Sequence, residues 1–126
     1  MDIVVEEDEA ALRDDLATVW QAGRDFFAAN PDITGAQLYE HMCQLGRDAG
    51  WEFGGHIAGH TVGQFPHEKI SGSDIQDHIM PGSDEPMRST DPAGLARHWI
   101  LEVHLVDRDA RYGGFYEQLL DIGPNA

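Results

Sequence analysis

The sequence has little cysteine, little lysine and no long apolar run. Its single cysteine, Cys43, excludes an internal disulfide and fits a reducing compartment. No apolar stretch is long enough to span a bilayer, and the opening residues, MDIVVEEDEA, lack the basic start of a signal peptide. We therefore expect a cytoplasmic protein with a single domain over residues 1–126.

Basic residues are scarce throughout the chain. Eight lysines and arginines stand against 23 aspartates and glutamates, and the formal net charge is −15 at pH 7. An acidic surface of this kind repels the phosphates of nucleic acids and of anionic membranes. Neither a nucleic acid nor a membrane surface is therefore an expected partner.

Two amphipathic helices are predicted in the first part of the chain. Over residues 7–29, apolar side chains recur at three- and four-residue spacing, and an Asn-Pro pair ends the pattern. The same spacing recurs over residues 34–49, with Thr34 as a suitable N-cap. Residues 2–5 are expected to form a short strand or a frayed arm. The two helices should pack as a helical hairpin.

A β-hairpin is predicted over residues 98–122. In the segment HWILEVHLV, residues 98–106, every second side chain is apolar, so that Glu102 and His104 project together from the other face. A last strand, FYEQLLDI, follows a polar turn and pairs antiparallel, which lets Glu117 approach Glu102. The predicted fold class is α+β, with two N-terminal helices packed on a mainly antiparallel sheet.

The two glutamates of this hairpin are candidates for function. A carboxylate on an apolar strand is costly to bury unless it is paired or binds a cation. The alternative interpretation for Glu102 and Glu117 is a sheet face that is open to water.

A long loop is predicted over residues 71–92, which are rich in Ser, Gly, Pro and Asp. Long loops in small domains often act as lids or binding loops. Asp74, Asp77 and His78 are possible ligands there, but a solvated loop is the more ordinary interpretation.

Histidines gather in the stretch GGHIAGHTVGQFPHE, residues 54–68. It contains His56, His60 and His67 among four glycines, which allow a tightly bent backbone. Histidine is the commonest metal ligand and proton shuttle near neutral pH. The stretch therefore indicates a metal or catalytic site, with a loop of surface histidines as the alternative.

This stretch resembles the signature of the pita-bread metallopeptidases, which include methionine aminopeptidase, aminopeptidase P and prolidase. The family pattern is His-x-x-Gly-His-Gly-x-Gly, followed by His-Glu or His-Asp. It is matched by His56, Gly59, His60 and Gly63, then by His67-Glu68, whereas Thr61 replaces the middle glycine. The resemblance implies that His60 binds metal, that His67 contacts the substrate and the developing oxyanion, and that His56 lines the substrate site.

The resemblance extends over about residues 8–122 and implies that Glu102 and Glu117 also bind metal. The family's usual Glu-Pro-Gly is Glu102-Val103-His104 in this chain. The two aspartates of the family's dimetal site come from strands upstream of the first helix, and this chain does not contain them. It therefore resembles the C-terminal half of a pita-bread domain. A half fold leaves an open sheet edge, so we expect a homodimer.

One histidine and two carboxylates leave open positions on a bound ion, as catalytic sites require. Such a site suits Mn, Fe, Co, Ni or Zn, and we expect one ion per chain. His104, on the face of Glu102, and His56, four residues before His60, are further candidate ligands.

The first functional hypothesis is a metal-dependent hydrolase that resembles Xaa-Pro peptidases and aminopeptidases and acts on a small peptide or amide. His67, His56 and Glu102 are its expected catalytic residues, and the substrate is a small molecule or a short peptide. The alternatives are a non-peptidase metalloenzyme, either a hydrolase or a lyase, and a catalytically inactive binding module.

Overall fold

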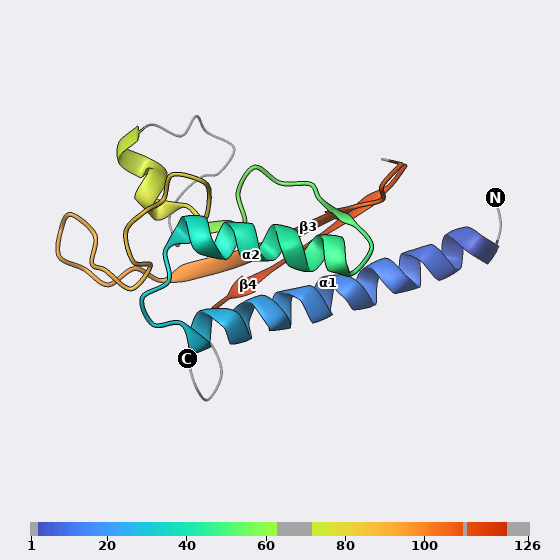
Figure 1. Ribbon diagram of the computed structural model, residues 1–126, viewed down its shortest axis with the longest axis horizontal. Coiled ribbons are helices and arrows are strands. Elements are labelled where there is room, and N and C mark those ends of the chain that lie inside the picture. The colour runs from blue at the N-terminus through green and yellow to red at the C-terminus, as the bar shows by residue number, and fades with distance from the viewer. Residues whose placement is uncertain (1–2, 63–71, 110, 121–126) are drawn as a thin grey trace.

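The computed structural model describes residues 3–62, 72–109 and 111–120, which form two helices and one antiparallel sheet (Figure 1). The α+β class and the two N-terminal helices on a mainly antiparallel sheet are therefore confirmed. The elements are α1 (Ile3–Ala29), α2 (Gly35–Asp48), β1 (Glu52–Phe53), β2 (Gly59–Thr61), a 3-10 helix (Gly72–Asp77), β3 (Trp99–Val106) and β4 (Gly113–Leu119).

Helix α1 begins earlier than the sequence predicts. The expectation of a strand or frayed arm before residue 7 is wrong, because the helix already includes residues 3–6. No proline or glycine interrupts the sequence between Ile3 and Gly23, so nothing stops the helix at the acidic run. None of the described helices combines the length and apolarity needed to cross a bilayer.

Helix α2 has the predicted ends. The hydroxyl of Thr34 accepts a hydrogen bond from the backbone N–H of Gln37, and the side chain of Gln37 accepts one from the N–H of Thr34. This reciprocal pair satisfies two backbone donors at the start of the helix. Gly50, just past the other end, has a φ of 97°, which favours glycine and ends the helix.

The sheet is organised around β3. β4 pairs along one of its edges, and β1 and β2 lie end to end along the other. Residues 55–57, between β1 and β2, bulge away from β3. They lie between two hydrogen bonds of the ladder: the N–H of Gly54 donates to the carbonyl of His104, and the N–H of Glu102 donates to the carbonyl of Ala58. The register of β3 and β4 places Glu102 opposite Glu117, as the sequence predicts.

The two faces of the sheet differ. One face, with Trp99, Leu101, Val103 and Leu105, is buried against the helices, which lie on the near side of β3 and β4 in Figure 1. The other face carries Glu102 and His104 of β3 and Phe115 and Glu117 of β4. Phe115 is 50% exposed, so the described elements leave part of this second face open.

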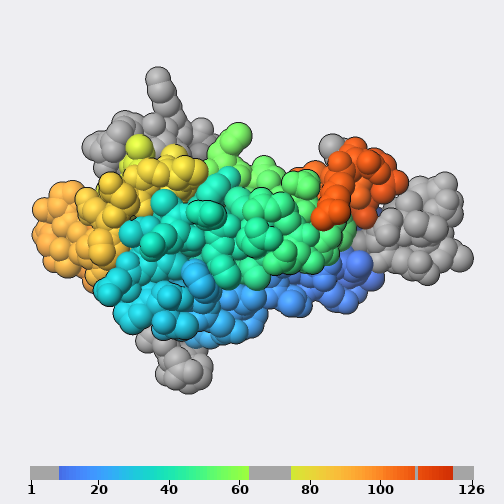
Figure 2. Space-filling view, viewed as in Figure 1, coloured from blue at the N-terminus to red at the C-terminus, as the bar shows by residue number. Residues whose placement is uncertain are grey.

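The segment 77–98 is anchored to the core at a few positions, while most of its side chains are exposed. Figure 2 shows it, in yellow to orange, continuous with the surface of the helices. Ile79 and Met87 are buried in the core, and His78 is only 2% exposed. The side chain of Asp77 pairs with Arg97 at 2.9 Å. The interpretation of this segment as solvated is therefore wrong for Asp77 and His78, while the side chain of Asp74 lies outside the described part.

The packing of β3 on the helices makes a prediction for stability. Leu101 is fully buried, and its backbone carbonyl accepts a hydrogen bond from the indole N–H of Trp20 at 2.9 Å. Leu101→Ala should lower the free energy of unfolding by about 2–5 kcal/mol because it leaves a cavity. Leu95→Ala is the control, since Leu95 is 65% exposed, and it should change stability by less than about 0.5 kcal/mol. Equal urea midpoints for the two variants would contradict this packing.

Candidate metal centre

One group of possible metal ligands is found among the described residues. His60, Glu102 and Glu117 each bring a ligand atom to within 4.8 Å of the others. The residues come from three neighbouring strands, β2, β3 and β4. His60 pairs with Ile100 and Glu117 pairs with Glu102, so the sheet register points all three side chains to the same face.

The ring of His60 is oriented by two contacts. Its Nδ1 lies 2.9 Å from the carbonyl oxygen of Thr61, and because a carbonyl only accepts, Nδ1 carries a hydrogen. Its Nε2 lies 3.0 Å from Oε2 of Glu102. In a neutral ring with the hydrogen on Nδ1, a lone pair on Nε2 would face an anionic oxygen. A proton or a metal ion must therefore lie between these two atoms.

The spacing of these two atoms also suits a metal ion. At metal–ligand distances of about 2.0–2.2 Å and angles of about 90–110°, two ligand atoms lie roughly 2.8–3.6 Å apart. The 3.0 Å between Nε2 of His60 and Oε2 of Glu102 falls in this range. An ion could replace the proton there without a change in strand register.

Electrostatics keep Glu102 ionised although it is only 4% exposed. Burial by itself would raise the pKa of Glu102, but the hydrogen bonds from His104 and His60 outweigh it and lower the pKa to about 2. The hydrogen bond with Glu102 raises the pKa of His60 above its usual 6.5, although burial opposes this shift. Without metal and below pH 6.5, the pair is therefore a buried imidazolium–carboxylate ion pair.

His104 contacts Glu102 but is not part of the ligand group. Its Nε2 is 3.1 Å from Oε1 of Glu102, the oxygen that does not face His60. The sequence correctly places His104 beside Glu102 on one face of β3. The structure brings it to the carboxylate as a hydrogen-bonding partner, while its role as a metal ligand stays a prediction.

A glycine allows β2 to approach β3 closely. Gly59 has a φ of 144°, in the range that favours glycine, and a Cβ at this position would collide with the carbonyl oxygen of Ile100. Gly59 immediately precedes His60, so the close approach of its backbone to β3 sets the position of the His60 Cα. This is a physical reason for the Gly-His pair.

The other predicted site residues are placed differently. His56 is exposed in the bulge of residues 55–57 and is not part of the ligand group. Residues four apart lie side by side on a helix, but this segment is not helical, so the spacing does not bring His56 beside His60. His67 lies outside the described residues. Tyr39 also contacts this bulge, because its hydroxyl donates to the carbonyl of Gly55 at 2.8 Å, and no spacing in the sequence indicates this contact.

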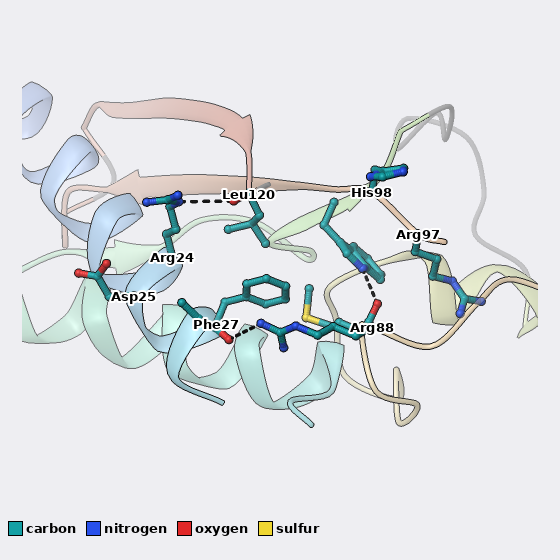
Figure 3. A pocket seen from close by; sticks show the side chains of 10 residues that line it. Arg24, Asp25, Phe27, Arg88, Arg97, His98 and Leu120 are labelled. Carbon is teal, nitrogen blue, oxygen red and sulfur yellow. Dashed lines mark hydrogen bonds between the residues drawn. The ribbon is translucent and has the colours of Figure 1, made fainter. Parts of the chain in front are cut away.

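A cavity of about 370 Å3 lies away from this cluster and shares no residue with it (Figure 3). Phe27, Arg88 and Trp99 are among its lining residues. The guanidinium of Arg88 donates to the backbone carbonyls of Phe27, Asn30 and Pro31, so it satisfies acceptors at the end of α1. Arg88 therefore has a structural role beside this cavity.

Comparisons with protein-family models, with curated proteins and with solved structures found no significant match. The resemblance to the pita-bread family therefore depends on the motif residues of this chain alone.

The ion pair of His60 and Glu102 makes a pH prediction for the metal-free protein. The pKa of His60 is raised, so its contribution to stability is complete below pH 6.5 and is lost as pH rises through the higher folded value. The pKa of Glu102 is lowered, so its contribution is present above pH 4.5 and is lost as pH falls through about 2. The pair should therefore stabilise most fully between these limits.

With a chelator present, the urea midpoint of the wild type should fall as pH rises above 6.5, because His60 loses its proton. The urea midpoint of His60→Gln should lack this fall, because glutamine does not titrate. A His60→Gln variant with the same alkaline pH dependence as the wild type would contradict the ion pair.

Proposed function

We propose that this chain holds one divalent transition-metal ion through His60, Glu102 and Glu117 and acts as a metal-dependent hydrolase on a small peptide or amide. The observation that carries the proposal is the 3.0 Å approach of Nε2 of His60 to Oε2 of Glu102, with Nδ1 of His60 committed to the carbonyl of Thr61. This arrangement needs a proton or a cation, and it has a second carboxylate, Glu117, beside it.

One imidazole and two carboxylates suit Mn, Fe, Co, Ni or Zn, and the donor set therefore fits the expected ion. When bound, such an ion acts as a Lewis acid that polarises a carbonyl and lowers the pKa of water. Three protein ligands leave positions for water and substrate. The open face of the sheet supports access to them, because Glu117 is exposed there.

The two glutamates differ in what they can do. Glu102 is buried, and each of its oxygens has a histidine partner, so it is suited to holding charge in a fixed place. Glu117 is exposed on the neighbouring strand, and it is the better placed of the two to accept a proton from water. His56 and His67 stay predicted substrate contacts, as the motif implies.

Support for a peptide or amide substrate comes from the order of His60, His67, Glu102 and Glu117, which matches that of the pita-bread peptidases. The position of His56 leans towards the branch that cleaves Xaa-Pro bonds. The homodimer likewise stays a prediction. The open face around Phe115 is the surface on which a second copy would be sought.

A second candidate is a non-peptidase metalloenzyme. The observation that favours it is His104, which stands where the family has the glycine of Glu-Pro-Gly and contacts Oε1 of Glu102. A changed carboxylate environment is a reason for changed chemistry at the same ion.

The proposal predicts metal binding by these side chains. Metal-free wild type, titrated with Mn²⁺, Co²⁺ or Zn²⁺, should bind about one ion per chain. His60→Ala and Glu102→Gln should each weaken binding by at least about 100-fold, since each removes a direct ligand. His41→Ala is the matched control, because His41 lies on α2 and stacks on Phe26, and it should bind as the wild type does.

Hydrolysis is tested on the loaded protein with a panel of dipeptides, Xaa-Pro peptides and simple amides. Turnover that is lost in Glu117→Gln supports the hydrolase. Metal binding without turnover of any peptide favours the non-peptidase enzyme. A wild type that binds none of the three ions would overturn the proposal, and the inactive binding module would become the leading hypothesis.

A further inference from the structure

We infer that His104 is a positioning residue, which holds Oε1 of Glu102 by a hydrogen bond so that Oε2 alone is presented to a single ion beside His60. This inference rests on the proposed metal centre, and it assigns His104 a role other than that of a ligand.

The first support is the division of the carboxylate between two rings. His60 faces Oε2 of Glu102 at 3.0 Å, and His104 faces Oε1 at 3.1 Å. Because Oε1 is an acceptor, Nε2 of His104 must carry the hydrogen that lies between them. A carboxylate that bridges two metal ions needs both oxygens, and here one of the two is occupied by an N–H donor. The geometry therefore limits Glu102 to one ion.

The second support is the contacts that flank the ring of His104, whose side chain is 29% exposed. The ring of Phe115 on β4 lies 4.6 Å from it and that of Phe53 on β1 lies 6.1 Å from it, both edge-on. A Cβ on Gly55 would lie 2.8 Å from Cδ2 of His104, so the bulge approaches the ring closely only because residue 55 is glycine. The strands on both sides thus fix the orientation of the imidazole.

The third support is the anchoring of the bulge itself. Tyr39 of α2 donates its hydroxyl hydrogen to the carbonyl of Gly55 at 2.8 Å, and the N–H of Gly54 donates to the carbonyl of His104 at 2.8 Å. These bonds connect the helix layer to the bulge and the bulge to His104. A partner that fixes a ligating carboxylate in this way sets its orientation, and its loss typically weakens metal binding by about 10–100-fold.

The test compares His104→Leu with His104→Gln. Leucine removes the donor, whereas the amide of glutamine can reach Oε1 with an N–H. His104→Leu should lower the affinity for Zn²⁺ by about 10–100-fold and change the visible absorption of the Co²⁺-loaded protein. His104→Gln should restore both to within about threefold of the wild type. His41→Leu is the matched control, because His41 lies on α2 and stacks on Phe26, and it should bind Zn²⁺ as the wild type does.

Two results would overturn the inference. If neither His104 variant changes the affinity or the Co²⁺ spectrum, His104 does not position Glu102. If both variants weaken binding equally, and X-ray absorption of the Zn²⁺ protein shows one nitrogen ligand fewer in each, then His104 is a direct ligand. Urea midpoints of all variants show whether a loss of affinity comes from a loss of folding.

A metal-free measurement separates this inference from the proposed function. In the apoprotein, ¹⁵N NMR of the histidine rings should show the hydrogen of His104 on Nε2, and Glu102→Gln should shift that signal. If the wild type binds no ion but Nε2 of His104 carries the hydrogen and Glu102→Gln shifts its signal, the hydrolase proposal is rejected. The hydrogen bond between His104 and Glu102 is then still supported. A hydrogen found on Nδ1 alone would overturn the contact itself.

Discussion

The 3.0 Å contact between Nε2 of His60 and Oε2 of Glu102 is the interaction on which the rest of the site depends. The other ring nitrogen of His60 is held by the carbonyl of Thr61, so the contact cannot be a neutral imidazole facing a carboxylate without a proton or a cation between them. A buried carboxylate is costly unless it is compensated, and two imidazoles compensate Glu102 here. The same contact that stabilises the metal-free fold is therefore the place where an ion can replace a proton.

The scaffold supplies this contact by dividing the sheet into two faces. Leu101, Val103 and Leu105 pack against the helices, and the alternation of β3 then sends Glu102 and His104 to the open side. Antiparallel pairing adds Glu117 from one edge of β3 and His60 from the other. The helices therefore support the sheet from the face opposite the candidate ligands.

The sequence predicts the part of this arrangement that follows from periodicity. The alternation of residues 98–106 and a short turn are enough to predict that Glu117 approaches Glu102, and the exact register comes from the structure. The helical spacing of apolar residues is enough to predict α2. The sequence did not predict that His78, Ile79 and Met87 are buried in the long loop, because these positions have no regular spacing. The bulge at residues 55–57 was also not predicted, since its shape depends on contacts with Tyr39 and His104, which are distant in the sequence. His67 lies outside the described residues, so its predicted role stays open.

If an ion replaces the proton shared by His60 and Glu102, metal binding must release that proton, and the release can be measured. Metal-free protein is titrated with Zn²⁺ by calorimetry at about pH 6, in two buffers with different ionisation enthalpies, where His60 is protonated. The wild type should release about one proton per bound ion, and His60→Ala should release none from this site. Zn²⁺ binding that releases no proton in the wild type would contradict it.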